Sequence, residues 1–113
     1  MLLKDILDLT GSKLLTPSIS LQTPAAGAYC CDLLSHVLAH GKEGMAWITV
    51  HTHMNVVAIA SLHRMACVIV SCSNVVPADV CAKAEEEGIA VLSSEKDSYE
   101  LCGLLYAAGL RNK

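Results

Sequence analysis

From residue 46 onward, short segments that are almost entirely apolar alternate with longer segments of helical character. The apolar segments are 46–50, 66–70 and 89–92, and the segments expected to be helices are 56–65, 77–87 and 97–108. A strand that is apolar on both faces must be covered on both faces, and strands that alternate with helices usually pair in parallel. The pattern therefore predicts an α/β fold with a mainly parallel sheet covered by helices on both faces.

The first 45 residues extend this arrangement. The predicted elements are a helix over 2–9 ended by Gly11, a short strand over 13–15, a loop over 16–24, a strand over 25–31, and a helix that follows Asp32 as its N-cap and stops at Gly41. A length of 113 residues suits one domain with a real core and is too short for two. We therefore expect a single domain over residues 1–113.

The chain carries few charges for its size. Charged residues make up 17 % of the sequence, against roughly 25 % in an average globular domain. From Gly44 to Ala78 the only charged residue is Arg64, and from Leu101 to Leu110 there is none. A largely buried middle and a final helix buried on more than one side would explain this, and the second side would face another copy of the chain. The alternative is a monomer with an unusually apolar surface.

The net charge of −3 argues against a general nucleic-acid binder, which needs a basic face. No apolar run approaches the ~20 residues that span a bilayer. An acid at Asp5, where a secretory signal would be apolar, favours a cytoplasmic protein. The six cysteines lie in apolar segments, so we expect them to be reduced and to act as small core side chains.

Three polar turns follow the strands over 46–50, 66–70 and 89–92, and they are the candidate binding site. Because parallel strands end at the same edge of a sheet, the turns are expected to converge where open α/β folds bind ligands. A helix N-terminus in the first turn could hold a phosphate group, although Thr52 or His53 could simply cap that helix. None of the turns has a glycine-rich phosphate loop. The candidate residues are Thr49, His51, Thr52, His53, Asn55, Ser71, Ser73, Asn74, Ser93 and Ser94.

Two histidine pairs have spacings that could bring both rings to one metal. His51 and His53 are two residues apart, and His36 and His40 are four apart on a predicted helix. Structural zinc usually needs four ligands and the chain has no Cys-x-x-Cys pair, so we predict no metal site and no cofactor. No nucleophile, base and orienting group share a pattern that indicates catalysis, and helix capping accounts for Asp32.

Three stretches resemble the DRTGG-domain family of small α/β modules. They are Ala25-Ala26-Gly27-Ala28-Tyr29-Cys30-Cys31-Asp32-Leu33-Leu34-Ser35, Trp47-Ile48-Thr49, and Asn55-Val56-Val57-Ala58-Ile59-Ala60-Ser61-Leu62. The resemblance runs from about residue 2 to residue 110. These modules occur alone or fused to phosphotransacetylase-like enzymes or CBS-containing pyrophosphatases, and they are similar to the N-terminal domain of HPr kinase/phosphorylase.

The resemblance implies a dimerising regulatory domain that responds to nucleotides, and it implies no reaction. The family's Gly-Gly-Tyr segment falls on Gly27, Ala28 and Tyr29, with Asp32 close by, which adds Gly27, Tyr29 and Asp32 to the candidate ligand residues. Ala28 replaces the second glycine and Ala26 replaces the preceding threonine. Whether this chain keeps a function that needs the threonine hydroxyl or the double glycine is therefore left open.

The sequence thus predicts a non-catalytic, homodimeric regulatory module that senses a nucleotide or another phosphorylated small molecule at the carboxyl-edge turns. The alternative is a protein-interaction adaptor of a redox or hydrogenase complex, because stand-alone members of the resembling family occur beside iron-only hydrogenase components.

Overall fold

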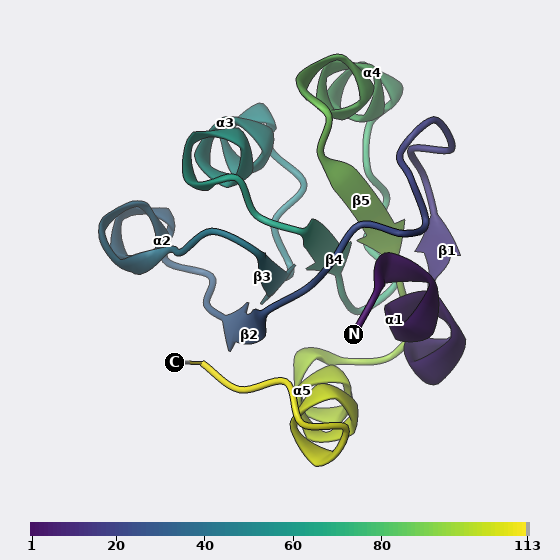
Figure 1. Ribbon diagram of the computed structural model, residues 1–113. Coiled ribbons are helices and arrows are strands. Elements are labelled where there is room, and N and C mark those ends of the chain that lie inside the picture. Colours follow the sequence, from purple (N-terminus) through teal and green to yellow (C-terminus); the bar gives the residue numbers. More distant parts are fainter. Residues whose placement is uncertain (113) are drawn as a thin grey trace.

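Four parallel strands and one antiparallel edge strand form a single five-stranded sheet in the computed structural model, which describes residues 1–112 (Figure 1). In chain order the elements are α1 (Leu3–Thr10), β1 (Lys13–Leu14), β2 (Gly27–Cys30), α2 (Leu34–His40), β3 (Met45–Thr49), α3 (Met54–His63), β4 (Cys67–Val70), α4 (Ala78–Glu87), β5 (Ala90–Ser93) and α5 (Ser98–Ala107). The predicted α/β class and the predicted order of elements are confirmed.

The strand order is β1-β5-β4-β3-β2, so consecutive parallel strands are neighbours. Helices α2, α3 and α4 lie on one face of the sheet, and α1 and α5 lie on the other (Figure 1). This follows from the common handedness of β-α-β crossovers, which places successive helices on the same face when the strands are added in one direction. After β5 the chain crosses to the opposite face, so α5 lies across the sheet from α4.

Side chains of the central strands point alternately into two cores. In β3, Met45 and Trp47 pack under α2, α3 and α4, whereas Ala46 and Ile48 pack under α1 and α5. All five residues of β3 are buried. Coverage on both faces, predicted from the apolar strands, is therefore confirmed.

The structure shows which apolar positions of the charge-poor segments a single chain leaves exposed. Helix α5 buries Leu101 and Leu105 but exposes Tyr99 and Tyr106, so in one chain it is covered on one side only. The charge-poor middle also includes exposed apolar positions, of which Leu62 on α3 is 67 % exposed. A segment without charges has few strongly hydrated groups, but its sequence does not show which of its apolar side chains are buried within a single chain.

The six cysteines are free in the structure, but they are not all core residues. Only Cys67 is buried; Cys30 and Cys72 are exposed, and the other three are half-buried. Strand ends and turns bring these side chains to the surface, which the local apolar sequence does not reveal.

Candidate functional site

The carboxyl ends of the parallel strands meet at one edge, and backbone hydrogen bonds join the turns that follow them. Ser71 N–H donates to Thr49 O at 3.1 Å, and Ser94 N–H donates to Val70 O at 2.9 Å. Ser73 N–H donates to Ser94 O, also at 2.9 Å. The turns therefore converge as the sequence predicts, and their role in binding a ligand stays a prediction.

The turn after β4 uses an uncommon backbone conformation to make these links. Cys72 and Ser73 both have left-handed φ angles, of 63° and 57°. Few residues other than glycine and asparagine adopt this region readily. Here it lets two consecutive N–H groups reach the β5 turn, since Cys72 N–H donates to Lys96 O at 2.9 Å.

Asp32 does not cap helix α2, which corrects the sequence-based expectation. The N-cap of α2 is Leu33, and it makes no side-chain cap. The Asp32 carboxylate instead accepts hydrogen bonds from Thr49 Oγ1 at 2.8 Å and from Val50 N–H at 2.9 Å. Because β2 and β3 end side by side, Asp32 lies beside the free donors at the end of β3 and ties the two strand ends together.

Several other candidate side chains are also used within the protein. His51 Nε2 bonds to Asp32 O at 2.7 Å, and Asn74 Nδ2 donates to Val50 O at 2.8 Å. The Ser71 and Ser98 hydroxyls lie 2.7 Å apart. These groups position the turns, and their bonds within the protein leave them less able to contact a ligand.

Helix α3 is capped by His53, one of the two residues expected for that role. The His53 Nδ1 atom accepts from Asn55 N–H at 3.1 Å. The side chains of Thr52 and Asn55 make no hydrogen bond within residues 1–112, and Asn55 is exposed. Of the predicted residues in this turn, Thr52 and Asn55 are the ones with free polar groups.

A hollow of about 370 Å³ lies where the N-termini of α3 and α4 come together. The positive ends of two helix dipoles therefore face the same space, which favours an anion. The Asp79 carboxylate on α4 opposes this, although it accepts a hydrogen bond from Val80 N–H at 3.0 Å. The lining residues are His51, Thr52, His53, Met54, Pro77, Asp79 and Val80.

Ser93 and Ser94 line a different hollow, of about 290 Å³, next to β1. Lys13 and Lys96 share it, and Lys96 Nζ donates to Thr10 O at 2.9 Å. The converging turns thus border two separate hollows rather than one rim pocket. The sequence did not show this, because it depends on the pairing of β1 with β5 from the other end of the chain.

Gly27 and Tyr29 lie apart from the turns. Gly27 is at the amino end of β2, where an added Cβ would be 2.6 Å from Arg111 O, so glycine is needed for the close approach of residues 110–112. The Tyr29 hydroxyl hydrogen-bonds to His36 Nδ1 on α2, and burial, with a smaller contribution from Cys31, raises the pKa of Tyr29. The structure therefore gives both residues neighbours that have no contact with the candidate ligand hollow.

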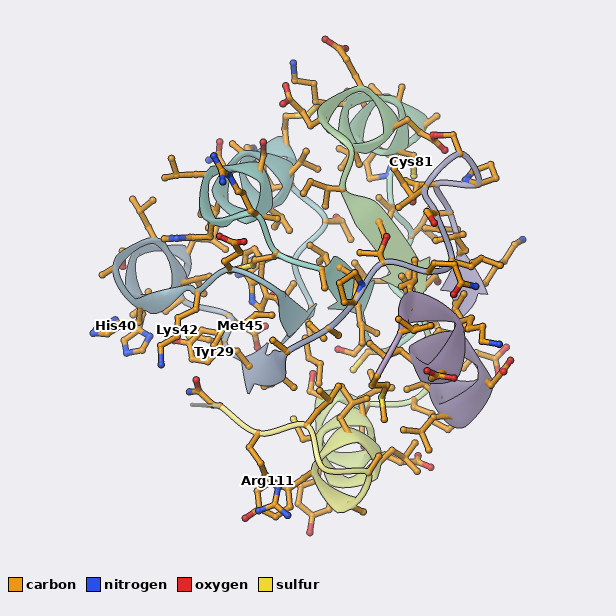
Figure 2. All side chains as sticks on the ribbon, in the orientation of Figure 1. Tyr29, His40, Lys42, Met45, Cys81 and Arg111 are labelled. Carbon is orange, nitrogen blue, oxygen red and sulfur yellow. The ribbon has the colours of Figure 1, made fainter. Side chains whose placement is uncertain are left out.

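The His36 and His40 rings stack on the exposed side of α2, with centroids 4.1 Å apart, and Figure 2 shows Tyr29 and His40 on the same side of the molecule. Stacked rings turn their faces to each other instead of aiming two nitrogen atoms at one ion. Within the described part of the chain, no group of three or more His, Cys, Asp or Glu side chains could hold a metal. Nor does any helix there have the length and apolar character to cross a membrane.

Two further hollows flank α5, and sequence reasoning did not identify them. One, of about 480 Å³, lies between α5 and the edge strand β2 and is lined by Cys30, Cys102 and Arg111 among others. The other, of about 570 Å³, lies over the exposed side of α5 between Tyr99 and Ala107. The uncharged helix was the only signal in the sequence that pointed to this region.

Comparison with known proteins gives a likeness in structure. No family model matches the chain, and no curated protein matches it. Among solved structures, the chain is similar to "the CBS and DRTGG domains of the regulatory region of Clostridium perfringens pyrophosphatase complexed with activator, diadenosine tetraphosphate", with a TM-score of 0.74. The likeness is one of fold. The two sequences are 17 % identical, and the match covers 91 % of this chain and 45 % of the other. This chain therefore spans about half the length of that neighbour, which is consistent with a DRTGG-like domain.

Proposed function

We propose that residues 1–113 form a single DRTGG-like domain that acts in the cytoplasm as a non-catalytic, homodimeric regulatory module. In this proposal it senses a nucleotide or another phosphorylated small molecule. The observation that carries the ligand part is the hollow between the N-termini of α3 and α4, where two helix dipoles and the free Thr52 hydroxyl face one space. The fold likeness to a nucleotide-regulated region supports it.

The ligand would place a phosphate group at the α3 end of the hollow, away from Asp79. There the backbone N–H of Met54 and the Thr52 hydroxyl can donate hydrogen bonds, whereas the N–H groups of Asn55 and Val56 already donate to His53. The free Asn55 side chain lies within the same turn. A base or sugar would extend toward Pro77 and Val80 on α4. Phosphate-bearing ligands with an apolar part are therefore favoured over inorganic phosphate.

A thermal-shift and calorimetry panel of ATP, AMP, diadenosine tetraphosphate and inorganic phosphate tests this. A ligand at 100 times its Kd should add about 2.7 kcal/mol of stability, which raises the Tm by about 10 °C. Thr52→Ala and Asn55→Ala should each weaken binding by about tenfold, the effect of one lost hydrogen bond to a charged group.

Ser93→Ala is the matched control, since Ser93 lines the hollow beside β1 instead. If Ser93→Ala abolished binding and Thr52→Ala did not, the ligand would lie in the other hollow and the proposed site would be wrong. A flat response to every nucleotide would contradict the sensing role.

The dimer part of the proposal rests on the α5 face, defined as Tyr99, Gly103, Leu104, Tyr106 and Ala107. Tyr99 is 89 % exposed and Tyr106 is 59 % exposed. An added Cβ at Gly103 would meet nothing within 4 Å, so another helix has room to approach there. Gly103 and Ala107 are small residues one turn apart that suit close packing of a second α5, and the segment 101–110 carries no charge. The charges beside this face are Glu100, which lines the same hollow, and Arg111, whose guanidinium lies 3.7 Å from the centre of the Tyr106 ring.

Multi-angle light scattering at micromolar concentration should give about twice the 12.0 kDa mass of one chain. Gly103→Lys should leave the fold intact, because the site is open and lysine favours helix more than glycine does. It should weaken the dimer by about 100-fold or more, because it buries an unpaired charge at the interface.

Leu62→Lys is the control, because it introduces the same charge at an exposed apolar position on a different helix, α3. A dimer broken by Leu62→Lys and not by Gly103→Lys would move the interface to α3. A wild-type monomer would contradict the dimer altogether. Exposed Leu33, Leu38 and Leu62 on the α2 and α3 side are also the surface that the alternative adaptor function would use toward a redox-complex protein.

A further inference from the structure

Two cysteines far apart in the sequence line one hollow between α5 and the edge strand β2. Cys30 ends β2, and Cys102 lies in the first half of α5. Both line the same hollow of about 480 Å³, and Cys102 lies close enough to contribute to a raised pKa of the Cys30 thiol. Cys30 is exposed and Cys102 is half-buried, so small solutes in the hollow can reach the pair.

The other four cysteines have different surroundings. Cys31 faces the opposite side of the sheet, where its Sγ atom donates to Leu33 O at 3.7 Å and lies 3.9 Å from His36 Nδ1. Cys67 is buried in the core under α1 and α5. Cys72 lies in the turn after β4, and Cys81 lies on α4, across the sheet from α5 (Figure 2). Cys30 and Cys102 are thus the cysteines whose thiols share one accessible hollow.

We propose that Cys30 and Cys102 are a thiol–disulfide exchange pair, which closes into an intramolecular disulfide when it reacts with a low-molecular-weight disulfide such as glutathione disulfide. In the first step one protein thiolate attacks a sulfur of glutathione disulfide, whose S–S bond breaks, and one glutathione leaves as the thiolate. In the second step the other protein thiolate attacks the protein sulfur of this mixed disulfide, and the second glutathione leaves. The two protein thiols are oxidised, one glutathione disulfide is reduced to two glutathione molecules, and the protons of the protein thiols pass to the departing thiolates.

The surroundings of the pair assign the order of the two steps. Partial burial, with a smaller contribution from the neighbouring Cys102, raises the pKa of Cys30 to about 12, so Cys30 holds its proton at neutral pH. Because the thiolate is the nucleophile, the exchange begins at Cys102. Once Cys102 carries glutathione, its smaller contribution to the raised pKa of Cys30 is lost, and Cys30, which lines the same hollow, gives up its proton as it attacks the mixed disulfide.

The disulfide would fasten α5 to the edge of the sheet. It would join the strand that ends the sheet to the helix that carries the α5 face, and it would close a loop from residue 30 to residue 102. A cross-link over so long a loop restricts the unfolded chain strongly. Oxidation should therefore raise the Tm by an amount on the order of 10 °C.

Peptide mapping of the full chain after incubation with glutathione disulfide at neutral pH tests the pairing. Free-thiol titration should fall from six to four, and the intact mass should fall by two hydrogen atoms. Tryptic cleavage separates the pair, because Cys30 lies in peptide 14–42 and Cys102 lies in peptide 97–111. Under non-reducing conditions these two peptides should appear as one linked species, which reduction should separate.

Serine variants test the individual sulfurs. Cys30→Ser should stop at a stable glutathione adduct on Cys102, and Cys102→Ser should leave Cys30 largely unmodified. Cys31→Ser, the matched control on the neighbouring residue, should still form the link between peptides 14–42 and 97–111. If the link survived in Cys30→Ser and was lost in Cys31→Ser, the partner of Cys102 would be Cys31, and the proposed pair would be wrong. A disulfide between two chains through Cys102, visible as a covalent dimer on a non-reducing gel, or no thiol loss at all, would overturn the proposal.

Discussion

Replacing Trp47 by alanine should lower the free energy of unfolding by about 4 kcal/mol, within the range for deleting a buried aromatic side chain. Trp47 is fully buried in the middle of the sheet, under α2, α3 and α4. Its indole N–H also donates to Cys31 O at 2.9 Å, so the variant loses a hydrogen bond as well as the packing. A small domain has only about 5–15 kcal/mol to lose.

Urea denaturation followed by circular dichroism measures this effect. Trp47 is the single tryptophan, so the variant has no intrinsic tryptophan signal and fluorescence cannot be used for the comparison. Trp47→Phe should cost less than Trp47→Ala, because it keeps most of the ring volume and loses the hydrogen bond. Leu62→Ala, on the exposed side of α3, should change the stability by no more than about 0.5 kcal/mol. If Trp47→Ala cost no more than Leu62→Ala, the assigned core would be wrong.

Asp32→Ala should lower the free energy of unfolding by about 2–3 kcal/mol. The carboxylate accepts hydrogen bonds from the Thr49 hydroxyl and from Val50 N–H, and alanine leaves both donors without their acceptor. Thr49 is fully buried, so water cannot readily replace the lost partner. Chemical denaturation of the two proteins gives the difference directly.

Asp32→Asn separates the hydrogen bonds from the charge. Its amide oxygen can still accept from Thr49 or Val50, so its cost should be smaller, about 1 kcal/mol. Asp8→Ala, which removes an exposed acid on α1, should cost almost nothing. If Asp32→Ala were as mild as Asp8→Ala, Asp32 would not tie β2 to β3. If Asp32 only capped helix α2, its replacement by alanine would cost about 1 kcal/mol, less than the loss expected here.

The outcome for Asp32 shows where sequence reasoning ends at this site. An acid just before an apolar helical segment is the usual signal for an N-cap, and the same rule does hold for Asp97, whose Oδ1 accepts from Glu100 N–H at 2.8 Å. At Asp32 the neighbouring strand end supplies competing donors from 17 and 18 residues away. Local spacing contains no information about such a competition.

At the candidate site, too, some features could be predicted from the sequence and others could not. The sequence predicted that the turns after β3, β4 and β5 would converge, because parallel strands share an edge. It did not predict that His51, Ser71 and Asn74 would be used to hold the turns together, nor that Ser93 and Ser94 would border another hollow with Lys13 and Lys96. Which polar groups stay free depends on contacts between segments, and those contacts form only in the folded chain.

The sequence by itself determined the α/β architecture, the order of the elements and the position of most helix ends, because alternation, apolar runs and capping are local properties that burial and backbone geometry impose directly. Only the tertiary structure decided that α5 has one exposed face, that α3 and α4 direct their N-termini into one hollow, and that Cys30 and Cys102 line another. Each of these depends on which face of the sheet a helix covers and on how far it extends over a strand. Those quantities follow from packing between residues distant along the chain, which no local pattern specifies.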